Sequence, residues 1–523
     1  MHPALSLCAA ALVATAFGGA NTPPPGPDDG RLSRFYQQRI DWGPCPASYD
    51  ESMRCGHLMV PLDYTHPAKG TVDLALTRFP ATGHPRLGSL VFNYGGPGGP
   101  GVSTLAERLQ DLHRTERYRD LAESYDLVGL DPRGIGQSAP ISCGGALPLR
   151  NSDSADGAGL LRATEAARRA CQAHSGPVLP YVGTANVARD LDVLREALGD
   201  RKLNYLGWSY GTRIGAVYAA QFPQRTGRMV LDGVDTLSDS LADQALDTAR
   251  GRQRAYDAFL DWCAGLTSCV FSGTHRREAN ERTEALIAHL DEKPLDAKGG
   301  AKFSGRDLAL ALVNNLYAPA QWPDLARGLG SLVRDRDPSG LLESAEPETD
   351  NEAAAWAAVS CADYPDRGVG GDPKAFQQQL DTLRPEFLDA SRIFGPAQLT
   401  EIAYCHSWPA PVDPTAGLRH VDAPPMLLVG VRGDPATPYA WTEQTARVLG
   451  NAVVLDYKGE GHTGFGRSDC VNQYIERYLL EGRLPHSTAA CPAEAVDAEG
   501  HEDVRPSERS RGPAGVPTEP TLR

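Results

Sequence analysis

Short apolar runs alternate with helical patterns over residues 57–240 of the chain. Two early runs, 56–64 and 71–80, predict an antiparallel pair of strands. Four later runs end in Gly, Asp or Ser and predict short buried strands at 88–96, 125–134, 203–209 and 227–234. Strands that alternate with helices indicate an α/β fold, in which a mostly parallel sheet is flanked by helices.

The clearest helix in this region spans 184–199. Its apolar residues recur at helical spacing, and Gly199 follows them as a stop signal. In sheets of this kind the reactive loops cluster at the carboxyl ends of the strands. The polar residues and glycines of this chain fall at those ends.

The pattern changes after residue 240. Helical stretches such as 244–265 and 305–318 dominate, and no strong strand pattern appears before two further apolar runs at 424–438 and 451–465. We therefore expect a core at 36–240, an inserted helical cap at 241–404 and a second core part at 405–492. The polar, Pro- and Gly-rich tail at 493–523 is expected to be disordered.

An apolar run at 4–17 has the length of a signal-peptide core and is too short to span a membrane. Small residues suited to cleavage follow at 18–20, and a Pro-rich segment occupies 21–35. His2 stands where a basic residue is usual. A lipid-modified Cys8 fits less well, because Leu7 precedes it where a small residue is needed. We expect a signal peptide at 1–20 and a secreted, extracellular protein; cell-wall association stays open.

Cysteine usage agrees with export. The chain has 11 Cys, and removal of Cys8 with the signal leaves an even number. Neighbours in sequence suggest these pairs, although sequence cannot establish the connectivity: Cys45–Cys55, Cys143–Cys171, Cys263–Cys269, Cys361–Cys405 and Cys470–Cys491. The chain contains no C-x-x-C pair, so its sequence gives no support for a zinc or thioredoxin-type site. The formal net charge of -15 argues against a nucleic-acid partner, which needs a basic face.

Ser209 stands in GWSYG at 207–211, which matches the pattern G-x-S-x-G. In a chain with 54 Gly the five letters alone carry little weight. Their context is more specific, because a strand-like run precedes Ser209 and a helix-like run follows it. A catalytic serine on a sharp strand-to-helix turn requires that context. The alternative is a structural turn serine.

A catalytic serine needs a base and an acid that orients the base. The chain order Ser, Asp, His predicts Asp434, just after one strand, and His462, in a glycine-flanked loop after the next. Other histidines lack that context, and other acids lie before or inside a strand; these alternatives are His406, His420, His486, Asp422 and Asp456.

The segment FNYGGPGGPG at 92–101 follows a strand and has few side chains, so its amides can approach a substrate carbonyl. Pro97 has no N–H. The expected oxyanion-hole donors are therefore the amides of Gly96 and Tyr210. Loss of one such donor costs about 3 kcal/mol of transition-state stabilisation. A flexible loop or a phosphate cradle is the alternative, but the spacing and lysine of a P-loop are absent.

Five segments, NYGGPGGPG, DPRGIGQS, GWSYGTRIG, RGDPATP and GEGHTGF, resemble in sequence and order those of the secreted tripeptidyl aminopeptidase group of α/β-hydrolases. This group comprises the Slp and Tap-like mycelial proteinases of actinomycetes and is related to prolyl aminopeptidases. The resemblance covers roughly 35–490. It implies an α/β-hydrolase fold with an inserted cap and a serine exopeptidase that releases short peptides, such as tripeptides, from free N-termini. One departure is Tyr94, where prolyl aminopeptidases have His.

Residue by residue, the resemblance implies Ser209, Asp434 and His462 as the triad and Gly96 and Tyr210 as the oxyanion hole. It implies peptide or protein substrates with a free N-terminus, and no metal or organic cofactor. Asp131 and Arg133 in DPRGIGQS are expected to brace loops rather than to touch substrate. The substrate ammonium calls for a carboxylate, and Asp363 in the cap is a candidate, with a solvated surface acid as the alternative.

The sequence motifs leave two alternative functions open. The same triad could serve a carboxylesterase or lipase, because it acts on the carbonyl rather than on the leaving group. A non-catalytic hydrolase-like binding module would normally lack a triad member, and all three are present here.

Overall fold

The computed structural model describes residues 30–112, 119–147, 157–297, 302–345, 349–364, 372–406, 408, 418 and 420–496. The signal peptide expected at 1–20, Cys8, most of the Pro-rich segment and most of the tail lie outside the described residues.

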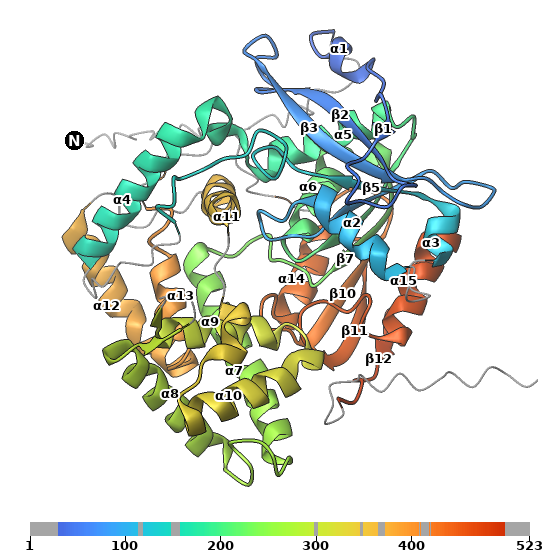
Figure 1. Cartoon of the computed structure of the whole chain (residues 1–523). Helices are drawn as coiled ribbons and strands as arrows, with labels where there is room; N and C mark the ends of the chain where they lie inside the picture. The colour runs from blue at the N-terminus through green and yellow to red at the C-terminus, as the bar shows by residue number, and fades with distance from the viewer. Residues whose placement is uncertain are drawn as a thin grey trace, which may run out of the picture.

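A ten-stranded sheet forms the centre of the described structure, in the order β1-β2-β3-β5-β4-β6-β7-β10-β11-β12 (Figure 1). The first four strands of this order pair antiparallel, as expected for 56–64 and 71–80, and the others pair parallel. The strands are β1 (Gly43–Pro44), β2 (Arg54–Pro61), β3 (Thr71–Phe79), β4 (Ser89–Asn93), β5 (Asp126–Leu130), β6 (Leu203–Trp208), β7 (Thr226–Asp232), β10 (Met426–Gly433), β11 (Ala452–Glu460) and β12 (Ala490–Cys491).

The central strands are continuous apolar runs because both faces of the sheet are covered. In β7, Met229 and Leu231 enter one hydrophobic core and Val230 enters the other. Helices α5, α6 and the end of α14 pack in the first core, and α2, α3 and α15 pack in the second. These helices are α2 (Gly101–Leu112), α3 (Arg119–Ser124), α5 (Thr184–Ala197), α6 (Tyr210–Gln221), α14 (Tyr439–Leu449) and α15 (Asp469–Glu481).

Between β7 and β10 the chain is almost entirely helical. Its first part builds a third core away from the sheet (Figure 1), while its later helices contribute to the first core. The helices of this insertion are α7 (Leu241–Ala264), α8 (Arg276–Glu292), α9 (Gly305–Leu316), α10 (Trp322–Asp335), α11 (Asp350–Asp363), α12 (Pro373–Ala390) and α13 (Gly395–Glu401). A two-residue strand pair, β8 (Leu295–Asp296) with β9 (Lys302–Phe303), is an exception that the pattern did not predict.

No range was predicted for the early helices α1 to α4, of which α2 and α3 are described above. α1 (Ser33–Tyr36) is a single turn, and α4 (Gly157–His174) precedes β6 in the chain. α4 packs against α12 of the helical insertion, and the amide of Gly157 donates a hydrogen bond to Gln377. Part of the chain before residue 240 therefore contacts the insertion rather than the sheet.

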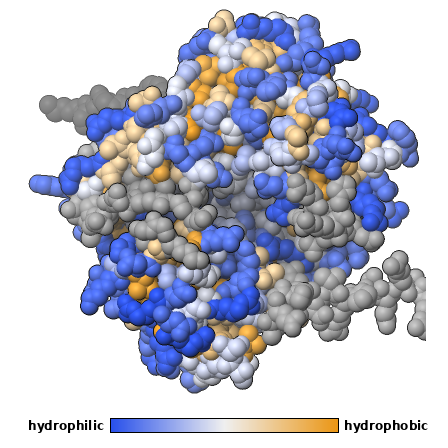
Figure 2. Space-filling view, viewed as in Figure 1, coloured by the Kyte–Doolittle hydropathy of each residue, from blue (hydrophilic) through white to orange (hydrophobic). Residues whose placement is uncertain are grey.

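The five expected disulfides are all present. Among the described residues, no helix combines the length and the apolar character that a membrane span requires. The face in Figure 2 is mostly hydrophilic, with apolar residues in scattered patches. The large apolar side chains that are most exposed come from separate elements: Met59, Leu87, Val333 and Leu388.

Candidate active site

Ser209 stands between β6 and α6, at the carboxyl edge of the sheet. Its backbone has φ 55° and ψ -129°, a conformation that side-chain-bearing residues rarely adopt. Such a conformation costs about 1–3 kcal/mol and persists only where the surroundings enforce it. The strained strand-to-helix turn is that of a nucleophile elbow. The serine also lies at the N-terminus of α6, where the helix dipole favours developing negative charge.

The two glycines of the elbow are required because neighbouring atoms leave no room for a side chain at either position. A Cβ on Gly207 would lie 2.5 Å from the carbonyl oxygen of Gly211, and a Cβ on Gly211 would lie 2.6 Å from Oδ1 of Asn93. Neither position therefore accepts a side chain without a shift of the backbone. The G-x-S-x-G spacing follows from the close contact between α6, β6 and the loop after β4.

Asp434 and His462 meet, although 28 residues separate them in sequence. Both carboxylate oxygens of Asp434 lie 2.9 Å from Nδ1 of His462. Asp434 follows β10 and His462 follows β11, which pair in parallel, so both residues emerge at the same edge of the sheet. Binding at Nδ1 leaves Nε2 as the ring nitrogen that can accept a proton.

The Asp434 carboxylate is held from several sides. The amides of Ala436 and Thr437 each donate to Oδ1 at 2.8 Å, and the Thr437 hydroxyl donates to Oδ2 at 2.9 Å. Burial alone would raise the pKa of Asp434, but the charge and hydrogen bond of His462 and these amides outweigh burial and lower it. Asp434 is therefore an ionised acid beside the imidazole. Thr437, three residues after Asp434, was missed from sequence.

The alternative residues lie elsewhere. Asp456, within β11, forms a bidentate pair with Arg432 at 2.8 Å for both contacts. His406 is buried against Phe376. His486 binds the hydroxyl of Thr488 on the surface. No hydrogen bond from these histidines to Asp434 occurs among the described residues.

The glycine-rich loop after β4 lies directly against the elbow. A Cβ on Gly95, which has φ 83°, would lie 2.9 Å from Cβ of Ser209 and 3.4 Å from the amide nitrogen of Tyr210. The Gly95 amide is already used, because it donates to Oδ1 of Asn93 at 3.0 Å. Gly96, the next residue, lines a cavity together with Ser209 and Tyr210. This arrangement supports Gly96 and Tyr210, rather than Gly95, as the oxyanion-hole donors.

The cavity above Ser209 has a volume of about 670 Å³. Its walls come from the core loops and from helices α7, α9, α11 and α13 of the insertion. Two of its wall residues also contact the Asp–His pair: Thr437 binds Asp434, and the ring of Tyr317 packs edge-on against His462 at 4.9 Å. The cavity thus lies between the elbow and the helical insertion, and Thr437 and Tyr317 connect its wall to the Asp434–His462 pair.

Asp363, the expected ammonium ligand, is in the wall of this cavity but is only 2% exposed. Its Oδ1 accepts the Thr184 amide at 2.9 Å, and its Oδ2 accepts the hydroxyls of Thr184 and Tyr210. Burial raises the pKa of Asp363, while the charge of Arg213 and these hydrogen bonds oppose the rise. Another carboxylate, Glu401 of α13, lines the same cavity.

Asp131 and Arg133 are both buried and bind the protein itself. Asp131 accepts the amides of Val102 and Gln137 at 2.8 Å each. Arg133 forms a fully buried pair with Asp190, with a closest contact of 2.6 Å. Neither residue lines the cavity, so both brace loops around the site.

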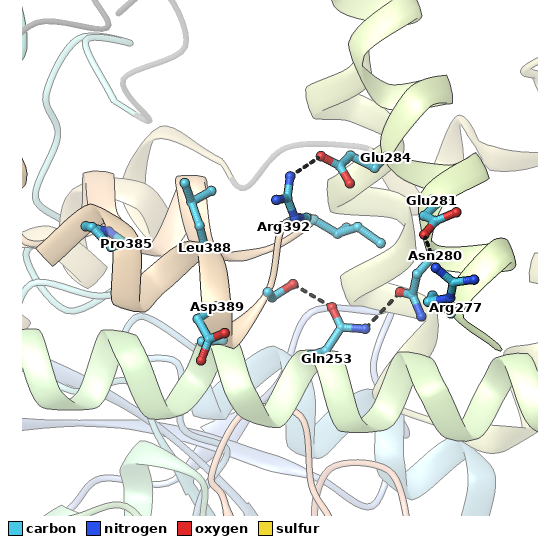
Figure 3. A pocket seen from close by; sticks show the side chains of 12 residues that line it. Gln253, Arg277, Asn280, Glu281, Glu284, Pro385, Leu388, Asp389 and Arg392 are labelled. Carbon is cyan, nitrogen blue, oxygen red and sulfur yellow. Dashed lines mark hydrogen bonds and ion pairs between the residues drawn. The ribbon is translucent and has the colours of Figure 1, made fainter.

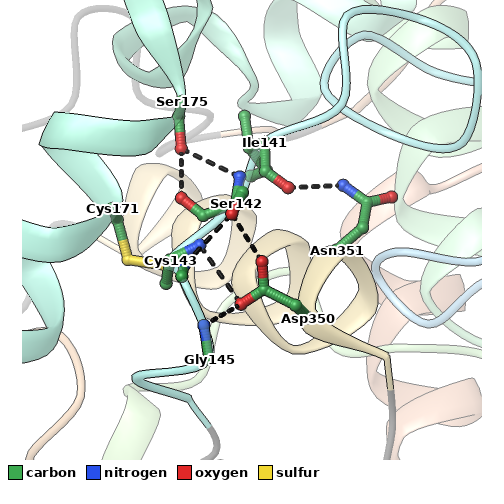
Figure 4. Close-up of a disulfide and its surroundings, with 9 residues drawn as sticks. Ile141, Ser142, Cys143, Gly145, Cys171, Ser175, Asp350 and Asn351 are labelled. Carbon is green, nitrogen blue, oxygen red and sulfur yellow. Dashed lines mark hydrogen bonds between the residues drawn. A yellow bond between two sulfur atoms is a disulfide. The ribbon is translucent and has the colours of Figure 1, made fainter.

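The start of α11 is anchored to the loop that follows Arg133, beside the Cys143–Cys171 disulfide (Figure 4). Asp350 accepts the Gly145 amide at 2.7 Å and the Ser142 hydroxyl. Asn351, next in the chain, donates to the carbonyl of Ile141 at 2.7 Å. α11 also packs on the oxyanion loop, because a Cβ on Gly98 would lie 3.3 Å from Cβ of Ala355. This helix therefore ties the cavity wall to the core.

The Asp350 anchor leads to a prediction on pH. Burial acts to raise the pKa of Asp350, but the Ser142 hydroxyl and the amides of residues 143–145 lower it overall. A lowered folded-state pKa stabilises the fold above the unfolded pKa of about 4, and that stability is lost as pH falls through the folded pKa. We expect Asp350→Asn to lower the free energy of unfolding at pH 7 by about 1 kcal/mol.

Thermal unfolding of both proteins between pH 7 and pH 2 checks this expectation. The difference between wild type and Asp350→Asn should shrink as pH falls. Asp422→Asn, at an exposed carboxylate, is the matched control and should show no difference at any pH. A difference for Asp350→Asn that stays constant with pH would contradict the assignment.

A second cavity, of about 710 Å³, lies among α7, α8 and α12 (Figure 3). Its polar side chains bind one another: Gln253 donates to Asn280 at 2.9 Å, and Arg392 pairs with Glu284 at 3.2 Å. None of the proposed catalytic residues lines it. The cavity above Ser209, by contrast, is lined by Gly96, Ser209 and Tyr210.

A mostly parallel sheet with a strained serine at a strand-to-helix turn, and an Asp–His pair at the same edge, defines a serine hydrolase of the α/β-hydrolase fold. The chain belongs to the tripeptidyl aminopeptidase group of that fold. Residues 391–491 match the family described as TAP-like protein. The chain is 34% identical to the serine protease Hip1 of Mycobacterium tuberculosis, over 87% of this chain and 91% of that protein.

Two other relatives differ in the activity that they are named for. The tripeptidyl aminopeptidase of Streptomyces lividans is 31% identical, over 89% of this chain and 88% of that protein. The carboxylesterase B of Mycobacterium tuberculosis is 32% identical, over 84% of this chain and 86% of that protein. Relatives of this chain are therefore named both as peptidases and as an esterase.

Proposed function

We propose that the protein is a serine exopeptidase that releases short peptides, tripeptides foremost, from free N-termini. The observation that carries the proposal is the partly enclosed cavity above Ser209, whose walls belong largely to the helical insertion. A cap of this kind admits a chain terminus more readily than the middle of a folded protein. Relatives named as a tripeptidyl aminopeptidase and a serine protease support the same class.

The proposed mechanism is acyl transfer. Nε2 of His462 takes the proton of the Ser209 hydroxyl, and the serine oxygen attacks the scissile carbonyl. The amides of Gly96 and Tyr210 stabilise the oxyanion, and Asp434 stabilises the imidazolium. His462 then protonates the leaving amine. Water, activated by the same imidazole, hydrolyses the acyl-enzyme and regenerates Ser209.

Exopeptidase activity requires recognition of the substrate ammonium at a set distance from Ser209. We propose Asp363 as a ligand for it, directly or through Tyr210, whose hydroxyl it binds. Glu401 of the same cavity is a second carboxylate that an ammonium group could reach. A cavity wall that carries acids selects for a positive charge at the end of the substrate.

The proposal predicts that a free N-terminus is required. Tripeptide anilides with a free α-amine should be hydrolysed, and acetylation of that amine should lower kcat/KM at least about a hundredfold, since a carboxylate would lose its charged partner. Dipeptide and tetrapeptide anilides should be poorer substrates. Measurement of initial rates with each anilide checks the prediction. Equal rates for free and acetylated peptides would overturn it.

Carboxylesterase activity is the second candidate, because a relative carries that name and the triad itself does not discriminate. The same assay with simple p-nitrophenyl esters separates the two functions. Hydrolysis of esters with no hydrolysis of free peptide anilides would favour the esterase.

We propose that the protein is exported. Five disulfides are typical of proteins that fold in an oxidising compartment. Export predicts that mass spectrometry of protein from the culture medium finds a mature chain without residues 1–20. An intact N-terminus on protein confined to the cytoplasm would contradict export.

A further inference from the structure

Asp232, the last residue of β7, lies beneath the catalytic residues and has no role in the mechanism above. Its backbone carbonyl accepts the amide of Ser209 at 2.9 Å. It pairs in register with Trp208, the residue before the nucleophile. The main chain of Asp232 therefore holds the nucleophile elbow from the neighbouring strand.

The side chain of Asp232 binds the loop that carries His462. Its Oδ1 accepts the amide of Gly464 at 2.8 Å, and its Oδ2 accepts the amide of Phe465 at 2.8 Å. These two amides belong to the second and third residues after His462. One residue thus contacts the nucleophile through its backbone and the base through its carboxylate.

The carboxylate is fully buried, at 0% exposure, and its hydrogen bonds among the described residues come from the Gly464 and Phe465 amides. Burial raises the pKa of Asp232 to about 6, against the hydrogen bonds of Phe465 and Gly464. A carboxylate has acceptor oxygens on both sides, so it satisfies both amides. An asparagine would turn an NH₂ group toward one of them.

A stack of rings connects the same parts of the site. Phe465, from the His462 loop, stacks on Trp208 at 6.2 Å between ring centroids. Trp208 stacks in turn on Tyr94, from the oxyanion loop, at 5.0 Å. Three catalytic segments are therefore packed together at one edge of the sheet, and Asp232 supplies the polar contacts between two of them.

We propose that Asp232 is a positioning residue that fixes the His462 loop against the nucleophile elbow and so sets the geometry between Nε2 of His462 and the Ser209 hydroxyl. The proposal rests on the triad of the proposed function. A displacement of about 1 Å in a catalytic group can lower the rate by a factor of about 100. Loss of the Asp232 contacts should therefore impair proton transfer more than substrate binding.

The test is Asp232→Asn in the full chain. We expect kcat for a tripeptide anilide to fall about ten- to a hundredfold, with KM within about twofold of wild type. The rate of Ser209 labelling by a serine-directed phosphonate should fall by the same factor. Rates are expressed per folded molecule, as judged by circular dichroism, so that partial unfolding does not mimic the effect.

Asp200→Asn is the matched control. Asp200 is a partly buried carboxylate that accepts the Ser89 amide at 3.0 Å, and burial raises its pKa as it does that of Asp232. It lies at the opposite edge of the sheet, where β4 begins. Asp200→Asn should lower the melting temperature without a change in kcat or in labelling rate.

An unchanged labelling rate in Asp232→Asn would overturn the proposal. If Asp232→Asn does not fold, Asp232→Ser is used, because the smaller hydroxyl still accepts one amide and leaves room for water. Unfolding of both variants under conditions where Asp200→Asn folds would assign Asp232 to stability and also overturn the proposal. Ser209→Ala distinguishes failure of the Asp232 proposal from failure of the proposed triad. Persistent labelling of that variant would refute the triad itself, whatever the effect of Asp232→Asn.

Discussion

Replacement of Ser209 by alanine is expected to lower kcat/KM for a tripeptide anilide by about 10⁶-fold, because the covalent route disappears altogether. Only substrate binding and the oxyanion-hole amides would remain to accelerate the reaction. The phosphonate reagent should no longer label the protein. Initial-rate kinetics and intact-mass spectrometry measure the two effects.

Two variants accompany Ser209→Ala. Ser272→Ala, at an exposed serine in a turn, should keep full activity and labelling. Ser209→Gly should be as inactive as Ser209→Ala but more stable than it by about 1 kcal/mol, because glycine tolerates φ 55°. Labelling that survives in Ser209→Ala would place the nucleophile elsewhere.

Asp434→Asn is expected to lower kcat by about 10⁴-fold with little change in KM. An asparagine amide would donate to Nδ1 of His462 and place the ring proton on Nε2, where the base must accept the proton of Ser209. The imidazolium formed in the transition state would also lose its counter-charge. Steady-state kinetics between pH 6 and pH 10 measure both parameters.

Asp456→Asn is the matched control, because sequence alone left Asp456 open as the acid. The structure binds its carboxylate to Arg432, so its replacement should leave kcat within about twofold of wild type. A large loss in Asp456→Asn together with an active Asp434→Asn would reverse the assignment.

Much of the fold could be predicted because its signals are local. The buried strands appear as apolar runs, and the observed β4, β5, β6, β7, β10 and β11 all lie inside the expected ranges or within one residue of them. The helix expected at 184–199 is α5. Pairing each cysteine with its nearest neighbour in the sequence also predicted the disulfides that the structure contains. Each of these features depends on residues within about one element of the chain.

The candidate catalytic residues could be predicted from the sequence for a similar reason. Ser209, Asp434 and His462 each follow a strand, and the carboxyl ends of parallel strands share one edge of the sheet. Chain order and local context were therefore enough to name them. Sequence could not decide which supporting groups would face them, because these come from distant segments.

Three features depended on tertiary structure alone. Asp232 was visible only as a strand end, yet the structure places its carboxylate on the amides after His462. Asp363 was named from sequence as a candidate ligand for the substrate ammonium, with a solvated surface acid as the alternative, and the structure buries it against Thr184 and Tyr210. Residues 157–174 fell within the range expected for the core, but they form α4, which packs on α12. Local pattern determines which elements form and where reactive residues stand, whereas burial and long-range hydrogen bonds arise only when separate segments meet.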